Sequence, residues 1–159
     1  MTEWEKAQNG YLYDANYDKE IIEARTRCAD LCYEFNNCRP SDIAKQQELL
    51  QQIIGNIKGT PVITAPFYCD YGVNVSIGEN FYTNHNVTIL DCTKVTFGDN
   101  VFIAPNCVFS TAGHAIDSEQ RNRPAYYGRR QCLDWNQCIR IAGRDYRKQY
   151  DYRRGKCCE

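Results

Sequence analysis

The sequence lacks several features that would each point to a particular class of protein. Its 159 residues include only two histidines, His85 and His114, and no two cysteines have the CxxC spacing. No stretch approaches the roughly 18 apolar residues that a membrane-spanning helix needs. The opening "MTEWEKAQNG" has no apolar segment of the kind found in signal peptides. We therefore expect no metal site, no membrane contact and a cytoplasmic location.

Cysteine, by contrast, is abundant, with ten in the chain. In the cytosol thiols stay reduced, so a disulfide framework is not expected. The spacing of Cys28, Cys32 and Cys38 could suggest zinc, but too few histidines and no CxxC pair accompany it. We interpret the cysteines as small buried apolar side chains.

Net charge is also nearly absent, at -1, which argues against a dedicated nucleic-acid-binding protein. The sum hides an asymmetry. Residues 129–159 hold nine Lys/Arg and four Asp/Glu, whereas the preceding residues hold ten and sixteen. A mildly acidic body therefore carries a basic tail. With 43% apolar and 25% charged residues, the chain is expected to be globular and to form one domain.

Residues 1 to about 58 have helical spacing. Asp18 can cap a helix whose apolar residues share one face. These residues are Ile21, Ile22, Cys28, Leu31, Cys32 and Phe35. Pro40 interrupts the pattern, and Ser41 or Asp42 can cap a second helix. The apolar stripe of that helix comprises Ile43, Leu50, Ile53 and Ile54, and Gly55 closes it. The two helices could cover one end of the segment that follows.

From residue 71 onward the period becomes six residues. Units begin at Tyr71, Ile77, Thr83 and Ile89 and, after a two-residue insertion, at Phe97 and Ile103. Two units share a turn, "IGEN" and "FGDN". A period of six fits a solenoid of short strands, three units to a triangular coil, with the first position inward and Gly or Asn at tight corners. The alternative is an ordinary β-sandwich with chance spacing.

Several motifs make the chain resemble the maltose and galactoside O-acetyltransferases. They are "LYDANYD", "YEFNNCRPSD", "APFYCDYG", "IGENFYTNHNVTILD", "FGDNVFIAPNCV" and "TAGHAIDSEQRN", within about residues 8 to 128. The resemblance implies a mainly β protein, a left-handed parallel β-helix of hexapeptide repeats preceded by an N-terminal α-helical segment. It also implies acetyl transfer from acetyl-CoA to a sugar hydroxyl, by homotrimers with active sites between subunits.

His114, in "STAGHAID", resembles the catalytic histidine of that family. A sugar hydroxyl needs a base to take its proton as it attacks the thioester, and neutral imidazole has a suitable pKa. His85, inside a repeat, is predicted to be a solvent-facing turn residue instead.

Asp70 in "CDYG" and Asn84 in "YTNHN" match family positions that contact the acceptor sugar. Carboxylate and amide groups make directional hydrogen bonds to hydroxyls. Both residue types also favour tight corners for local reasons, which leaves a structural alternative open. Asp14 and Asp91 are weaker candidates for the same task.

The resemblance ends near residue 128. Ala115 follows the histidine where the family usually has proline, and Tyr126 stands where many members have glutamate. Further repeat coils, which build much of the CoA groove in the family, are replaced by the basic tail. Read one base later, the codons of residues 129–159 can encode such repeats, which suggests a frameshift near Gly128. CoA-binding residues are therefore not assigned.

We expect three segments: an N-terminal helical segment (1–58), a left-handed β-helix with an acceptor loop (59–128) and an atypical, disordered basic tail (129–159). The predicted function is acetyl-CoA-dependent sugar O-acetylation, with the acceptor side present and most of the donor side missing. The alternative is a non-catalytic solenoid whose tail binds nucleic acid through arginines and stacking tyrosines.

Overall fold

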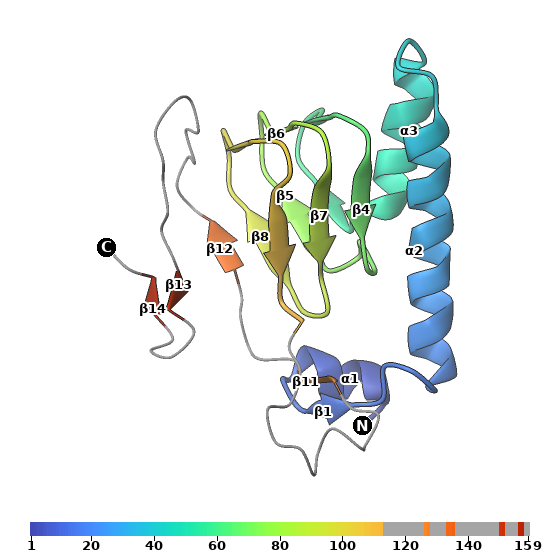
Figure 1. Ribbon diagram of the computed structural model, residues 1–159, viewed down its shortest axis with the longest axis vertical. Helices are drawn as coiled ribbons and strands as arrows, with labels where there is room; N and C mark the ends of the chain where they lie inside the picture. Colours follow the sequence, from blue (N-terminus) through green and yellow to red (C-terminus); the bar gives the residue numbers. More distant parts are fainter. Residues whose placement is uncertain (113–125, 128–132, 136–149, 152–155, 158–159) are drawn as a thin grey trace.

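The computed structural model describes residues 1–112 and, beyond them, the backbone of four short strands. Three helices precede a coil of parallel strands, shown in Figure 1. The helices are α1 (Glu3–Gln8), α2 (Lys19–Asn37) and α3 (Ile43–Ile53), and β1 (Leu12–Tyr13) lies between the first two. The coil contains β2 (Asn56–Ile57), β3 (Val62–Ile63), β4 (Phe67–Cys69), β5 (Val75–Ile77), β6 (Tyr82–Thr83), β7 (Val87–Leu90), β8 (Val95–Phe97), β9 (Phe102–Ile103) and β10 (Val108–Ser110). The later strands are β11 (Tyr126–Tyr127), β12 (Leu133–Trp135), β13 (Tyr150–Asp151) and β14 (Lys156–Cys157).

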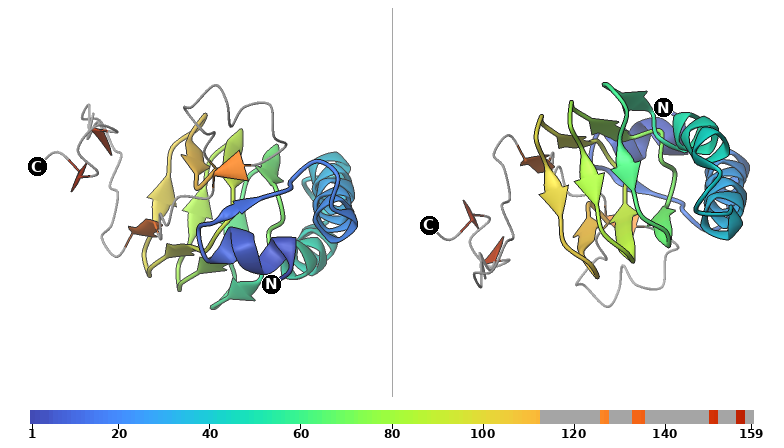
Figure 2. Two further views of the ribbon diagram at one scale, coloured as in Figure 1. Left: turned by 90° about the horizontal axis from the view of Figure 1, so that it is seen from below. Right: turned by 90° about the horizontal axis from the view of Figure 1, so that it is seen from above.

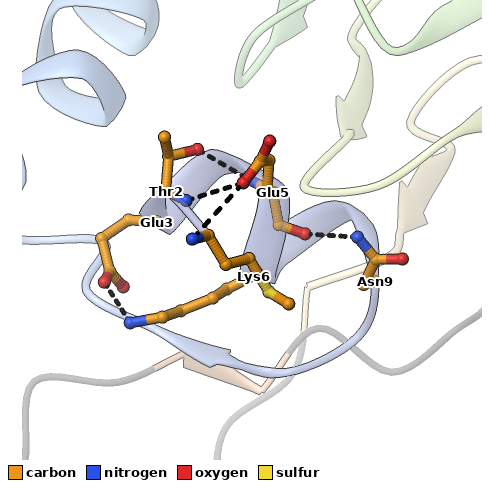
Figure 3. A network of polar contacts seen from close by, with 6 residues as sticks. Thr2, Glu3, Glu5, Lys6 and Asn9 are labelled. Atoms are coloured by element: carbon orange, nitrogen blue, oxygen red, sulfur yellow. Dashed lines mark hydrogen bonds and ion pairs between the residues drawn. The ribbon is translucent and has the colours of Figure 1, made fainter.

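The first helix begins with a capping box, drawn in Figure 3. The Thr2 hydroxyl accepts a hydrogen bond from the Glu5 amide at 3.1 Å, and the Thr2 amide donates to the Glu5 carboxylate at 2.8 Å. These bonds satisfy amides that would otherwise lack helical partners. Lys6 pairs with Glu3, whose other carboxylate oxygen accepts from the Asp14 amide at 2.6 Å. A helix of six residues is thereby tied to the loop after β1.

The two longer helices begin where the sequence predicts. Asp18 caps α2, and Asp42, one of the two predicted candidates, caps α3. Both helices lie side by side against the first coil, and Figure 1 shows them beside β4, covering one end of the stack of coils. The predicted apolar faces hold at most positions, but Ile43 is exposed because it occupies the first turn of α3, away from the coil.

Gly55 follows α3 for a different reason from the predicted one. It is not among the residues with positive φ. A Cβ added there would lie 2.1 Å from the Val73 carbonyl oxygen, so glycine is needed because the backbone of the coil passes very close.

The strands form three parallel sheets, which make the three faces of a prism (Figure 2). Their orders are β2-β5-β8-β12, β3-β6-β9 and β4-β7-β10. Within residues 56–110, paired residues on neighbouring strands of a sheet are 20 residues apart, as in Ile57 with Ile77 and Phe67 with Val87. The fold is therefore a left-handed β-helix, as the resemblance implied, and not a β-sandwich.

The predicted inward positions other than Tyr71 are buried in the coil, and their apolar side chains belong to one continuous core. Its coil members include Val75, Ile77, Phe81, Val87, Ile89, Val95, Phe97, Val101 and Ile103. Phe97 contacts both Phe81 and Phe109, with ring centroids 5.4 and 5.1 Å apart, so aromatic side chains join successive coils. This burial is the main stabilising contribution to the coil.

The six-residue count is wrong at one unit. The residue that stacks on Ile89 is Cys69, not Tyr71, so the two extra residues recur in each coil and the first strand precedes Tyr71. Tyr71 is buried in a second cluster, where it meets the N-terminal segment and the Trp4 ring at a centroid distance of 5.2 Å. The extra residues thus form the surface against which the N-terminal segment packs.

The corners of the prism are of two kinds. We call residues 70–74 and 90–94 the long corners, because they contain the two extra residues. Residues 78–80, 84–86, 98–100 and 104–106 are the tight corners, and each ends at an asparagine with φ between 53° and 61°. Asparagine tolerates this left-handed conformation better than most residues, which confirms the predicted corner role.

Beyond residue 112 only strand pairings are described. β11 pairs antiparallel with β1, and β12 extends the β2-β5-β8 sheet in parallel. β13 and β14 pair with each other. The rest of residues 113–159, including most of the predicted tail, lies outside the described residues.

Candidate functional site

Asp70, the first predicted sugar contact, opens a long corner directly after β4. It is half-buried, and burial raises the pKa of its carboxyl, an effect that the Arg25 guanidinium and the Cys92 thiol partly offset. The Cys92 sulfur lies 3.8 Å from Asp70 Oδ2 and donates to it. The Asp70 carboxylate thus lies at the surface of the corner and is held from the next coil.

Asp91, one of the weaker candidates, occupies the next long corner and is completely buried, with 0% exposure. Its Oδ1 accepts hydrogen bonds from the Asp70 amide at 3.0 Å and the Tyr71 amide at 2.9 Å. Its carbonyl oxygen accepts from the Asn74 side chain at 2.7 Å. Burial raises the pKa of Asp91 to about 7, although the bond from the Tyr71 amide opposes that rise. A fully buried side chain cannot contact a sugar, so Asp91 supports the corner instead.

Asn84, the second predicted sugar contact, opens a tight corner and is half-buried. Its Oδ1 accepts from the His85 amide at 2.7 Å, which is the local turn chemistry that the structural alternative proposed. No partner of its Nδ2 is found among the described residues, so that donor can face a ligand. His85 is exposed, with Nδ1 2.5 Å from the Ala65 carbonyl oxygen, which confirms it as a solvent-facing corner residue.

Asp14 is used within its own loop. Its Oδ1 accepts from the Asn16 and Tyr17 amides at 3.0 and 2.9 Å, an arrangement in which aspartate stabilises a turn. Arg25, which reasoning from the sequence missed, reaches this loop from α2 and donates to the Ala15 carbonyl at 3.1 Å. A single arginine on a helix carries no sequence signal of its own, because only the packing of α2 brings it close to Asp70.

The structure places the predicted sugar contacts apart within one chain. Asp70 follows β4, where its amide bonds to Ile89 near the end of β7. Asn84 precedes β7, at the other end of the same sheet. At about 3.3 Å per residue, the intervening strand separates them by roughly 10 Å or more. His114 and Ala115 lie outside the described residues, and of Tyr126 only the backbone is described.

Thr111 lies three residues before His114 in the sequence and belongs to the described part of the chain. Its hydroxyl accepts from the Thr93 amide at 3.0 Å and donates to the Leu90 carbonyl at 3.0 Å. It therefore supports the second long corner as Asp91 supports the first.

The described cysteines behave largely as predicted. Cys28, Cys32 and Cys92 are buried, and Cys38, Cys69 and Cys107 are partly buried, all six as free thiols. Burial raises the pKa of the Cys92 thiol to about 11. Within residues 1–112 and the four later strands, no group of three or more His, Cys, Asp or Glu side chains is placed to hold a metal ion. In the same part of the chain no helix is long and apolar enough to cross a membrane.

A repeated coil with an N-terminal helical cap defines the class of hexapeptide-repeat proteins. Comparison with known proteins shows which family of this class the chain matches. Residues 6–59 match the family described as the maltose acetyltransferase hexapeptide capping motif. Galactoside O-acetyltransferase of Escherichia coli is 41% identical over 107 residues, which are 67% of this chain and 53% of that protein. A Saccharomyces cerevisiae protein with an acetyltransferase designation is 48% identical over 112 residues, 70% of this chain and 57% of its own length.

Solved structures agree. A maltose O-acetyltransferase from Clostridium difficile 630 superposes with a TM-score of 0.78 at 38% identity, over 80% of this chain and 68% of that one. A galactoside acetyltransferase in complex with coenzyme A superposes with a TM-score of 0.76 at 37% identity, over 80% of this chain and 64% of that one. The chain therefore belongs to the maltose/galactoside O-acetyltransferase family. It spans a little over half the length of the two curated relatives named above.

Proposed function

We propose that this chain takes part in acetyl transfer from acetyl-CoA to the hydroxyl of a sugar. The observation that carries the proposal is family membership, because relatives are named galactoside and maltose O-acetyltransferases and one was solved with coenzyme A. The comparisons favour this function over the nucleic-acid-binding alternative, which rests on residues 129–159.

In this proposal His114 is the general base and Asp70 and Asn84 bind the acceptor. The imidazole takes the proton of the sugar hydroxyl as the oxygen attacks the thioester carbonyl, and CoA leaves as the thiol. The Nδ2 donor of Asn84, which has no partner among the described residues, and the half-buried Asp70 carboxylate suit hydroxyl groups.

We further propose a homotrimer in which sites are shared between subunits. The separation of Asp70 from Asn84 within one chain supports this, since residues at opposite ends of a sheet can meet across an interface. An apolar strip also runs beside Asn84: Val62, Tyr82 and Phe102 are neighbours across β3, β6 and β9, and the last two rings lie 6.1 Å apart. Val62 and Phe102 are exposed, which suits contact with a second subunit. The free thiols of the described residues support a cytoplasmic location.

Thiol release from acetyl-CoA, measured with maltose and with methyl galactosides, tests the proposal. His114→Ala should lower the rate by about a hundredfold or more, because general-base catalysis contributes that much. The matched control is His85→Ala, which removes the other histidine from an exposed corner and should leave the rate within about twofold. Sugar-independent release, or equal losses in both variants, would refute the assignment of His114.

A further inference from the structure

We propose that Asp91 is a positioning residue for the acceptor site: its buried carboxylate fixes the backbone from which Asp70 projects. The inference rests on the proposed function of Asp70. It assigns Asp91 no contact with sugar or acetyl-CoA, whereas the sequence analysis named Asp91 a weaker candidate for direct sugar binding.

The first argument is geometric. A single oxygen, Asp91 Oδ1, accepts from two consecutive amides, those of Asp70 and Tyr71, at 3.0 and 2.9 Å. The Asp70 amide is shared with the Ile89 carbonyl at 3.2 Å. Two bonds to adjacent amides leave the Asp70 backbone little freedom to rotate, so they set the direction in which its side chain leaves the corner.

The second argument concerns the next residue. Cys92 donates its thiol to Asp70 Oδ2 at 3.8 Å, and its carbonyl oxygen accepts from the Gln8 side chain at 3.2 Å. The dipeptide Asp91–Cys92 therefore holds both the backbone and the carboxylate of Asp70, and links them to α1. Both of these contacts to Asp70 come from the same long corner, residues 90–94.

The third argument is burial. Asp91 is completely buried, and no hydrogen-bond partner of its Oδ2 is found among the described residues. Keeping a half-satisfied carboxyl inside a protein is unfavourable, and burial also keeps water from replacing Oδ1, so the buried Tyr71 amide depends on Asp91 for its hydrogen bond. Thr111 serves the corresponding corner in the next coil with a hydroxyl.

The prism provides a matched control in Asp99. Its Oδ1 accepts from the Glu79 amide at 2.8 Å, again across the 20-residue repeat, but at a tight corner and exposed to solvent. Asp91 and Asp99 thus make the same kind of bond, and only Asp91 makes it to the proposed sugar contact.

Three variants of the full chain test the proposal: Asp91→Asn, Asp91→Leu and Asp99→Leu. Asparagine keeps an oxygen that can accept the two amide hydrogen bonds. Asp91→Asn should therefore hold the KM for the acceptor sugar within about twofold of the wild-type value. Asp91→Leu should raise the KM for maltose or methyl galactoside about tenfold or more, with a smaller change in kcat and an unchanged KM for acetyl-CoA. Asp99→Leu should leave the acceptor KM unchanged.

Amide hydrogen exchange at Asp70 and Tyr71 gives a readout that does not depend on turnover. Protection should persist in wild type and Asp91→Asn and fall at least tenfold in Asp91→Leu. If the wild-type chain releases no thiol with any sugar, the proposed function fails, and exchange alone decides whether Asp91 holds the Asp70 backbone. Unchanged protection or an unchanged acceptor KM in Asp91→Leu would overturn the inference. If that variant does not fold, rapid exchange of both amides in wild type would do so.

Discussion

The long and tight corners of the coil use similar bonds in different surroundings. At the tight corners, side chains form ladders on the surface: Asn80 donates to Asn100 at 2.9 Å and Asn86 to Asn106 at 2.8 Å. At the long corners, the supporting side chains of Asp91 and Thr111 are buried. Each kind of corner therefore presents one proposed sugar contact, Asn84 at a tight corner and Asp70 at a long corner, but only the long corners rest on buried supporting side chains.

The largest effect is expected at a tight corner where backbones touch. In Gly78→Val the added Cβ would lie within 2.5 Å of the Gly98 backbone, which cannot move aside as a side chain can. The free energy of unfolding should fall by about 3 kcal/mol or more, measured by urea denaturation. Ser76→Val, on the outer side of the adjacent strand, should change it by less than about 1 kcal/mol.

Removing the carboxylate of Asp91 at a long corner and of Asp99 at a tight corner should cause different losses of stability. Asp91→Leu leaves the buried Tyr71 amide without its acceptor and removes one of the two acceptors of the Asp70 amide, so it should lower stability by about 2–3 kcal/mol. In Asp99→Leu the Glu79 amide loses its partner but can bond to water, so the free energy of unfolding should fall by about 1 kcal/mol or less. Equal losses in urea denaturation would show that burial does not distinguish the corners.

The pH dependence of stability sharpens the comparison. The pKa of Asp91 is raised from 3.8 to about 7 by burial, so the folded chain binds this proton more tightly than the unfolded chain. The resulting stabilisation is full below about pH 4 and is lost as pH rises through 7. Between pH 5 and 7.5 the wild type should lose about 2 kcal/mol more than Asp91→Asn. Parallel stability–pH curves for the two proteins would contradict the raised pKa.

The smallest effect is expected from the asparagine ladders. Asn80→Ala removes one exposed hydrogen bond and puts a Cβ without local compensation at φ 53°, for a loss of about 1–2 kcal/mol. Asn80→Gly restores conformational freedom and should recover about half of that loss. Thermal denaturation would measure both, and an identical midpoint for the two variants would show that backbone strain contributes nothing.

Much of the fold could be predicted because it repeats. The six-residue spacing of residues such as Ile77, Ile89 and Ile103 predicts the coil, and "IGEN" and "FGDN" predict its corners. The count failed at Tyr71, since one buried aromatic side chain at the expected spacing cannot show whether it faces the coil or the N-terminal segment. Likewise, the sequence offers Asp70 and, as weaker candidates, Asp14 and Asp91 for sugar binding, but it does not show which of these side chains is buried.

The sequence by itself determined the period, the cap at Asp18, the start of the second helix at Ser41 or Asp42 and the use of Gly or Asn at the tight corners, because these depend on neighbours a few residues away. Only the tertiary structure decided which aspartate reaches the surface. A 20-residue repeat stacks Asp91 on Tyr71, and Asp91 is completely buried there. Burial, which depends on contacts between distant segments, makes Asp91 a support and leaves Asp70 available to a ligand.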